Sequence, residues 1–327
     1  MPTIEARTPS TVQAVVEPVA PAASVQAPIP ATRAELIAIA EADYDARLVA
    51  IDRALIRDIF SPANDAGATA TQLEGKVASS AVDCLSYLLI LTAIDYRCWQ
   101  QEEGAIVRYQ HQGKVGRSAL WAAFSTAWGL DDLAPDRLRA ALAERGINGV
   151  FGNISDPAGR QKILDEILGG RSVDTFCATV IRQGRLLEKV TVADASALAR
   201  RFPTAFADRY LIKAQFALAM FSGCARRAGI SHDAANLTAF ADDQAPRILR
   251  TLGVLRYARE VADAVDAWQL LASESAVERA IRAATILACE EIAAHTGRTA
   301  VDVDGLLRLS QDVDSTAPFH LTETTSY

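Results

Sequence analysis

Two adjacent carboxylates, Asp242 and Asp243, lie in the segment FADDQAP at residues 240–246. They follow an apolar stretch and precede a predicted helix, where an aspartate makes a good N-cap. Adjacent carboxylates usually point in different directions, so one can cap the helix while the other faces a pocket. A carboxylate near a cleft can stabilise an oxocarbenium-like transition state or activate water. On spacing alone, the capping role is favoured.

A lysine stands inside an apolar helix predicted over residues 208–228. The segment DRYLIKAQFALAMF at 208–221 places Lys213 and Gln215 among residues that would bury most faces of that helix. A lysine in such a place must extend its ammonium to solvent, pair with an acid, or serve in a site. Snorkelling to solvent is the favoured interpretation from this pattern alone.

A third segment, AIDYRCWQ at residues 93–100, places Asp95, Tyr96 and Trp99 at the exit of a predicted buried helix. Such a polar and aromatic cluster could stack a planar ring and hydrogen-bond its edge. The alternative is an ordinary helix end with core aromatic residues, and spacing does not decide between the two.

Other kinds of chemistry lack their sequence signals. The five cysteines and four histidines are scattered, with no CxxC, HExxH or HxxxH spacing, so no disulfide framework and no metal site are predicted. The sequence also has no GxGxxG after a predicted strand, no P-loop and no GxSxG elbow. Phosphate-cradling loops and serine-hydrolase chemistry are therefore unsupported.

Composition narrows the partners. The chain has 327 residues, 50% of them hydrophobic, with 33 Lys and Arg against 40 Asp and Glu for a net charge of −7. An acidic chain is a poor binder of duplex nucleic acid or of anionic membranes. A small molecule or another protein is the more natural partner. No secretory signal is recognised, and the longest apolar run (85–94) is too short to span a bilayer, so a cytoplasmic protein is expected.

The elements that must position these residues are mostly helices. Residues 1–31 are rich in Pro and Ala and are predicted to be a disordered tail, and a single helical domain is predicted over 32–327. A capping box at Thr32 and Glu35 should begin one long amphipathic helix that ends near Phe60.

Further elements follow from periodicity and turn residues. A buried helix is expected over 75–95, and a small β-hairpin in 105–118 turning at Gln112-Gly113. Residues 147–153 could be a strand or a glycine-rich loop, and the segment at 317–327, taken alone, suggests a frayed tail. The remaining helices are predicted at 118–128 with Ser118 as its cap, at 135–145, from Asp156-Pro157 to Gly169, and at about 172–183, 191–201, 208–228, 244–256, 258–272, 275–295 and 302–313. The predicted class is mainly α.

In order and spacing, several segments resemble the queuosine salvage protein family, the queuosine 5′-phosphate N-glycosidases. The resemblance runs from about residue 75 to the C-terminus. The segments are AIDYRCW, VRYQHQGKVGRSALWAAF, KAQFALA, FADDQAPRILRTLGVLRY, ERAIRAATILACEEI and PFH…Y, of which the FAD…P…L…LG.L.Y block is the most specific.

The resemblance implies a helical fold similar to helix-hairpin-helix DNA glycosylases. It implies release of the 7-deazaguanine base queuine, or an analogue, from a nucleoside 5′-monophosphate or nucleoside. No metal or organic cofactor is implied, and the partner is a small nucleotide and not a nucleic acid duplex.

Residue by residue, Asp242 matches the catalytic aspartate of the family. Lys213 matches a basic position and would pair with that aspartate or bind the phosphate. Asp95, Tyr96 and Trp99 match the segment that holds the base, which in the family typically begins with Asn and not Asp. That exchange replaces an amide donor with an acceptor and should alter which base edge is read.

Three further positions match the binding region of the family. Asp243 stands where a tyrosine commonly follows the aspartate, and Tyr257 and His320 match positions with less defined roles. Two other functions stay open: a divergent member that performs glycosyl transfer or condensation in a specialised nucleoside pathway, and a nucleotide-binding protein without catalysis.

Overall fold

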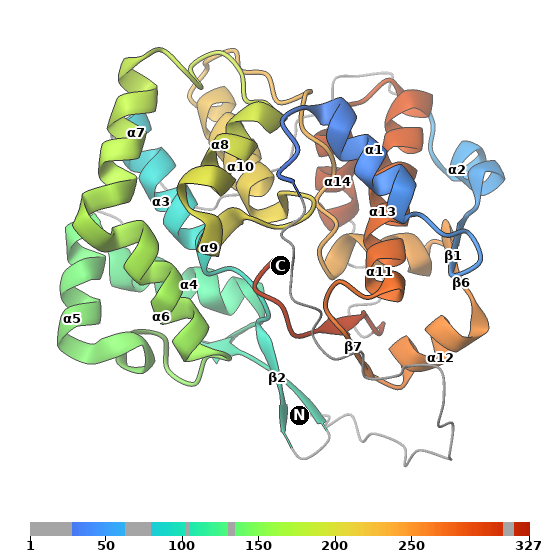
Figure 1. Ribbon diagram of the computed structural model, residues 1–327, viewed down its shortest axis with the longest axis horizontal. Helices are drawn as coiled ribbons and strands as arrows, with labels where there is room; N and C mark the ends of the chain where they lie inside the picture. The colour runs from blue at the N-terminus through green and yellow to red at the C-terminus, as the bar shows by residue number, and fades with distance from the viewer. Residues whose placement is uncertain (1–27, 63–79, 103–104, 130–134, 310–316) are drawn as a thin grey trace. The chain divides into compact units, whose positions relative to one another are not determined.

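The computed structural model describes residues 28–62, 80–102, 105–129, 135–309 and 317–327. These ranges are mainly helical, as the sequence predicts, and they also contain short two-stranded sheets (Figure 1). Residues 1–27 of the predicted tail lie outside the described residues. None of the described helices is both long enough and apolar enough to cross a membrane.

The chain divides into two compact units. The Asp242 unit comprises the described parts of residues 1–70, 103–105 and 238–323, and the Lys213 unit those of 71–102, 106–237 and 324–327. The single domain expected over 32–327 stays a prediction.

The Asp242 unit is built around one long helix, α13 (Ala276–Thr296), against which α1, α11 and α14 pack. Its apolar core includes Ile248, Leu249, Ile281 and Ile292. In chain order its other elements are α1 (Arg33–Asp43), β1 (Val49–Ile51), α2 (Arg53–Ile59), α11 (Gln244–Thr251), β6 (Leu255–Tyr257), α12 (Arg259–Asp266), β7 (Leu270–Leu271), α14 (Ala300–Leu309) and β8 (Leu321–Thr322).

The single long helix expected from Thr32 to Phe60 is wrong. The capping box of Thr32 and Glu35 does begin α1, but α1 ends at Asp43. Strand β1 follows and pairs antiparallel with β6, and Asp52 then caps α2. The apolar period of three and four residues fitted a helix, but pairing with a strand more than 200 residues away fixes 49–51 as extended backbone.

The β1–β6 pairing also shortens the helix predicted over 244–256. Helix α11 ends at Thr251 instead of continuing to 256, because Gly253 turns the chain with a φ of 79° and β6 begins at Leu255. Helix α12 likewise ends at Asp266, and β7 pairs in parallel with β8. The C-terminal segment is therefore not frayed: Phe319, His320 and Leu321 are buried.

The Lys213 unit has two buried helices in contact, α3 (Ala81–Ala93) and α10 (Ile212–Arg227). Both are apolar on nearly every face, as predicted. Its other elements are β2 (Trp99–Glu102), β3 (Ala105–Arg108), β4 (Gln110–His111), β5 (Lys114–Val115), α4 (Arg117–Trp128), α5 (Pro135–Phe151), α6 (Pro157–Leu168), a 3-10 turn (Gly169–Arg171), α7 (Ser172–Arg182), α8 (Val192–Arg201) and α9 (Pro203–Phe206).

The predicted hairpin at Gln112-Gly113 is confirmed, because β4 and β5 pair across it and both turn residues have positive φ. Strand β3 pairs with β2, which the sequence did not predict. Helix α4 begins at Arg117 with Gly116 at its N-cap, so the expected Ser118 cap is wrong.

The strand or loop expected at 147–153 is also wrong. Helix α5 kinks at Gly146, where φ is 64° and ψ 177°, and then runs on to Phe151. Glycine permits that backbone without ending the helical run. The helix predicted from Asp156-Pro157 to Gly169 is confirmed as α6, with the Asp156 side chain accepting from the backbone of Gly159.

Candidate functional site

Asp242 lies in the turn that leads into α11 and is 2% exposed. Its Oδ1 accepts hydrogen bonds from the backbone N–H groups of Gln244 (2.9 Å) and Ala245 (3.3 Å). One oxygen of the carboxylate therefore satisfies the start of the helix, which is the structural role that the spacing favoured. Asp243 stands at the N-cap position, but its side chain makes no capping bond.

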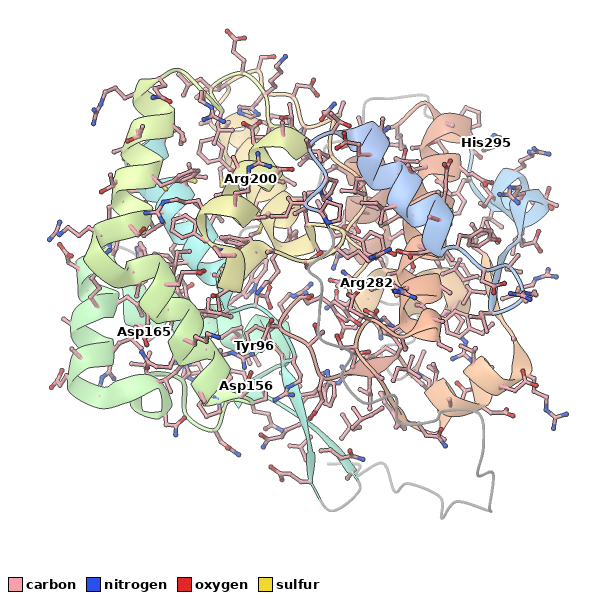
Figure 2. All side chains as sticks on the ribbon, viewed as in Figure 1. Tyr96, Asp156, Asp165, Arg200, Arg282 and His295 are labelled. Atoms are coloured by element: carbon pink, nitrogen blue, oxygen red, sulfur yellow. The ribbon has the colours of Figure 1, made fainter. Side chains whose placement is uncertain are left out.

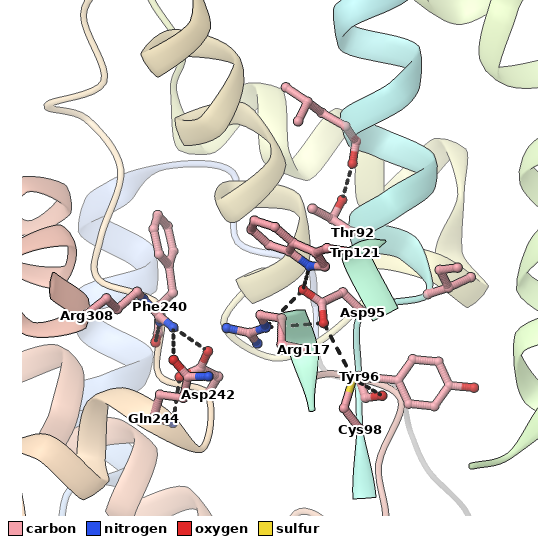
Figure 3. A network of polar contacts seen from close by, with 12 residues as sticks. Thr92, Asp95, Tyr96, Cys98, Arg117, Trp121, Phe240, Asp242, Gln244 and Arg308 are labelled. Carbon is pink, nitrogen blue, oxygen red and sulfur yellow. Dashed lines mark hydrogen bonds and ion pairs between the residues drawn. The ribbon is translucent and has the colours of Figure 1, made fainter. Parts of the chain in front are cut away.

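The second oxygen of Asp242 meets a cation. Arg308 of α14 donates from Nη1 to Asp242 Oδ2 at 2.8 Å, and its Nη2 donates to the carbonyl of Phe240 at 3.1 Å (Figure 3). The guanidinium is itself held by Asp304, one turn earlier in α14, at 2.5 Å from Nε to Oδ2 and 3.2 Å from Nη2 to Oδ1.

Asp304 also reaches the backbone of the same segment. Its Oδ1 accepts from the Phe240 N–H at 3.1 Å. Burial raises the pKa of Asp304, while the Arg308 guanidinium opposes that shift and the nearby charge of Asp242 adds to it. Asp304 and Arg308 thus hold this segment through the N–H and the carbonyl of Phe240 and through the carboxylate of Asp242.

A second buried ion pair lies on α13. Arg282, which Figure 2 labels, donates from Nε to the carbonyl of Ala241 at 3.2 Å and from Nη1 to Glu278 at 3.1 Å. Both side chains are 1% exposed. Burial lowers the pKa of His320 to about 4; Arg282 adds to that shift, whereas Glu278 and Asp242 oppose it. His320 therefore lies within the electrostatic reach of Asp242.

Tyr257 sits elsewhere in the Asp242 unit. It pairs with Val49 in the β1–β6 sheet, and the Arg250 guanidinium lies 4.8 Å from its ring centroid. Arg250 in turn forms two hydrogen bonds with Asp266, at 2.8 and 2.9 Å. These contacts give Tyr257 a packing role in the sheet, and its predicted binding role is not tested by them.

In the Lys213 unit, two buried cations converge on the C-terminus of α3. The Lys213 ammonium donates to the carbonyl of Ala93 at 2.8 Å. Arg160 donates from Nε to the backbone carbonyl of Ile94 at 3.2 Å and from Nη2 to the backbone carbonyl of Tyr96. Cations are favoured where the last carbonyls of a helix have no partner within the helix. Snorkelling, the interpretation favoured from sequence, is wrong, because Lys213 is 4% exposed.

Burial is the largest influence on the protonation of the Lys213 ammonium. It lowers the pKa of Lys213 to about 7; Arg160 adds to the shift, while Asp208, Asp95 and Glu166 oppose it. A lysine with such a pKa can gain or lose a proton near neutral pH, which suits it to acid–base or electrostatic roles.

The ring of Tyr96 lies close to both cations. Arg160 Cζ is 4.1 Å and Lys213 Nζ 5.1 Å from the ring centroid. The phenol donates to Asp156 Oδ2 at 3.0 Å, and the two residues are neighbours in Figure 2. Burial raises the pKa of Tyr96. The tyrosine is thus fixed at both its ring face and its hydroxyl.

Asp95 is 3% exposed and both of its oxygens accept from side chains of α4. Trp121 Nε1 donates to Oδ2 at 3.0 Å, and Arg117 Nε lies 3.0 Å from the same oxygen and 3.2 Å from Oδ1 (Figure 3). The Arg117 guanidinium also lies 5.6 Å from the ring centroid of Phe216 in α10. Asp95 therefore organises a cation and an indole at the end of α3.

Trp99 lines a pocket of about 160 Å³ within the Lys213 unit. The other lining residues come from β2, from β3 through the start of β4, and from the loop after α5, and they are Gln100, Val107, Arg108, Tyr109, Gln110, Asn153 and Ser155. Trp99 is 7% exposed, so most of the indole is packed inside the unit. No group of three or more metal-ligating side chains occurs among the residues that the structure describes.

Comparison with known proteins decides the family. The queuosine salvage protein family model matches residues 204–314. A queuosine 5′-phosphate N-glycosylase/hydrolase from Sphaerobacter thermophilus is 30% identical over 274 residues, covering 74% of this chain and 81% of the relative. This chain belongs to the queuosine salvage protein family.

The part matched by the queuosine salvage model contains Lys213, Asp242, Asp243 and Tyr257, but not Asp95, Tyr96, Trp99 or His320. The structure brings Lys213, Asp95 and Tyr96 together in one unit. It places Asp242 and His320 within electrostatic reach in the other. Pairing of Lys213 with Asp242 stays a prediction, because the two residues belong to different units.

Sequence reasoning missed the partners that hold these residues. Arg308 and Asp304 share one face of a helix that was predicted, and their spacing of four residues was the available signal. The burial of Arg160 and Arg282 was harder to predict, because a single arginine in an amphipathic helix usually lies on the solvated face. Only the packing of distant segments shows that both are fully buried.

Proposed function

We propose that this protein is an N-glycosidase that releases a 7-deazaguanine-type base, queuine or an analogue, from a nucleoside 5′-monophosphate or nucleoside. The observation that carries the proposal is the buried, fully oriented carboxylate of Asp242, inside the segment matched by the queuosine salvage family. The name of the Sphaerobacter thermophilus relative supports the same reaction class.

Hydrolysis of an N-glycosidic bond needs a fixed negative charge. The bond between ribose C1′ and the base nitrogen lengthens, positive charge grows on the ribose, and a nearby carboxylate lowers the energy of that state. Water then adds its oxygen to C1′, and the base nitrogen leaves with a proton. Asp242 supplies the carboxylate in this proposal.

Lys213 is proposed as the second catalytic group. With its pKa near 7, it can hold a positive charge for a phosphate or deliver a proton to the departing base. Asp95, Tyr96 and Trp99 are proposed to hold the base, with Asp95 acting with Arg117 and Trp121. Asp243, Tyr257 and His320 are proposed to complete substrate binding, on a fold similar to helix-hairpin-helix DNA glycosylases.

The decisive test measures free base after incubation with queuosine 5′-phosphate, queuosine and guanosine 5′-monophosphate. The Asp242→Asn variant should lose about 1,000-fold in turnover, in the range of losing one oriented electrostatic group. Asp263→Asn is the matched control, since Asp263 is exposed and 3.7 Å from Arg259 in the same unit. Equal inactivity of wild type and Asp242→Asn on every substrate would end the proposal.

A second measurement separates the possible roles of Lys213. If its ammonium binds the 5′-phosphate, Lys213→Met should reduce activity on queuosine 5′-phosphate much more than on queuosine. If it acts on the leaving base, both substrates should slow alike. Running the reaction in ¹⁸O-labelled water then shows whether water or another acceptor attacks C1′, which distinguishes hydrolysis from glycosyl transfer.

A further inference from the structure

The surroundings of Asp242 contain more than a helix cap requires. Two backbone N–H groups on Oδ1 already satisfy the start of α11. The additional contact of Oδ2 with Arg308, itself bound by Asp304, places three charged side chains in a nearly dry environment: their exposed fractions are 3%, 14% and 1% for Asp242, Arg308 and Asp304. A buried ion pair adds little net stability compared with apolar packing, so stability alone does not account for it.

We infer that Arg308, oriented by Asp304, is a positioning residue that sets the direction and charge of the Asp242 carboxylate for the reaction. The inference rests on the proposed function. Oδ1 is held by the backbone and Oδ2 by Nη1 at 2.8 Å, so the carboxylate cannot rotate about its Cβ–Cγ bond without losing hydrogen bonds on both sides. A charge fixed in advance needs no reorganisation when positive charge develops on the ribose.

Arg308 itself is held from three directions. Nε and Nη2 bind the two oxygens of Asp304, and Nη2 also donates to the Phe240 carbonyl. Asp304 accepts the N–H of Phe240, so the helix turn that carries the guanidinium is tied to the chain two residues before Asp242. Moving Arg308 would therefore displace Asp242 together with its backbone.

The neighbouring guanidinium also gives Asp242 a chemical role. A carboxylate beside a fixed cation is a weaker base than an isolated one. Because Oδ1 already accepts two backbone N–H groups and Oδ2 accepts Nη1 of Arg308, Asp242 acts as a charge that stabilises the ribose cation, and not as the group that removes a proton from water. A purely structural Arg308 would affect stability but leave the pH dependence of turnover unchanged.

The experiment compares the full-length wild type with Arg308→Gln, Arg308→Lys and Asp304→Asn, using queuosine 5′-phosphate across pH 4–9. We expect Arg308→Gln to lower kcat about 100-fold, the scale of a small misplacement of a reacting group, with KM changed less than about threefold. Its acidic limb should move to higher pH, because the Asp242 carboxylate has lost the neighbouring positive charge.

The other variants keep the inference testable if Arg308→Gln does not fold. Arg308→Lys retains the charge but not the forked geometry, so its acidic limb should return to the wild-type position while kcat recovers only in part. Asp304→Asn keeps an acceptor for the Phe240 N–H, and its kcat should fall about tenfold through a loosened Arg308.

Arg53→Gln is the matched control, since it removes an ion pair of 2.7 Å with Glu291 in the same unit and should leave kcat and the pH profile unchanged. Thermal melts check that each variant is folded. An active wild type that depends on Asp242, combined either with wild-type kcat and pH profile in Arg308→Gln or with wild-type kcat in both Arg308→Lys and Asp304→Asn, overturns this inference alone. A wild type inert on every substrate overturns the proposed function and this inference with it.

Discussion

In the Asp242 unit, Arg282 and Arg308 face carboxylates, whereas in the Lys213 unit, Arg160 and Lys213 face the carbonyls that end α3. Both arrangements place charge in a low-dielectric interior, where an unsatisfied charge is very costly. They differ in what happens when a partner changes. When the cation is removed, a carboxylate partner is left as an unpaired buried charge. A carbonyl partner is neutral and leaves no such charge.

This difference predicts two kinds of sensitivity. The ion pairs of the Asp242 unit should be sensitive to substitution of a single partner. The lysine of the Lys213 unit should be sensitive to pH, because a carbonyl stabilises an ammonium less than a carboxylate does and the amine can become neutral.

The largest effect is expected from Arg282→Met. It leaves Glu278 buried without its cation, so the free energy of unfolding at pH 7 should fall by about 3–5 kcal/mol. The double variant with Glu278→Met should recover part of the loss, because both charges are then gone. Urea denaturation measures both. Arg259→Met, at an exposed pair, should change the free energy by less than about 0.5 kcal/mol.

The next effect is a pH dependence at Lys213. Its folded pKa, about 7, lies below the ordinary lysine value of 10.5, so between these values the unfolded chain binds more protons. The free energy of unfolding should therefore rise with pH by about 1.4 kcal/mol per pH unit above pH 7, relative to Lys213→Met. Urea titrations at pH 7, 8 and 9 compare the two proteins, with exposed Lys114→Met as control. Parallel curves would show that Lys213 is not desolvated as the contacts indicate.

A smaller pH effect is expected at His320. Its folded pKa of about 4 lies below the ordinary value of 6.5, so the unfolded chain gains a proton first as the pH falls. Stability present above pH 6.5 should be lost by about 2 kcal/mol between pH 6.5 and 5 in the wild type, and not in His320→Gln. His295→Gln, in the last turn of α13, serves as the control. This result would show that the stability of the Asp242 unit also depends on pH, but in the acidic range.

The smallest effect is expected from Tyr96→Phe. It removes the 3.0 Å hydrogen bond to Asp156 but keeps the ring beside Arg160 and Lys213. The free energy of unfolding, measured by thermal melts, should fall by about 1 kcal/mol, the usual contribution of one hydrogen bond. Tyr96→Leu removes the ring as well and should cost distinctly more in the same thermal melts. Equal losses would mean that the ring adds nothing to the stability of this cluster.

Local signals in the sequence were sufficient for much of the framework. The capping box at Thr32, the Gln112-Gly113 turn and the Asp156-Pro157 start of α6 are confirmed because each depends on residues within four positions of one another. The buried character of α3 and α10 likewise follows from their apolar composition. Expectations failed where pairing with a distant segment overrode a local period, as at β1 and at the β7–β8 pair.

For the candidate site, the sequence by itself determined that Asp242 precedes a helix, that Lys213 stands in an apolar one, and which family motifs contain them. Tertiary structure alone decided their partners: Arg308 and Asp304 for the carboxylate, and the end of α3 for the ammonium. The physical reason is that a residue's type and spacing set what it can donate or accept, whereas the group it meets, and the water it loses, depend on segments far away in the chain.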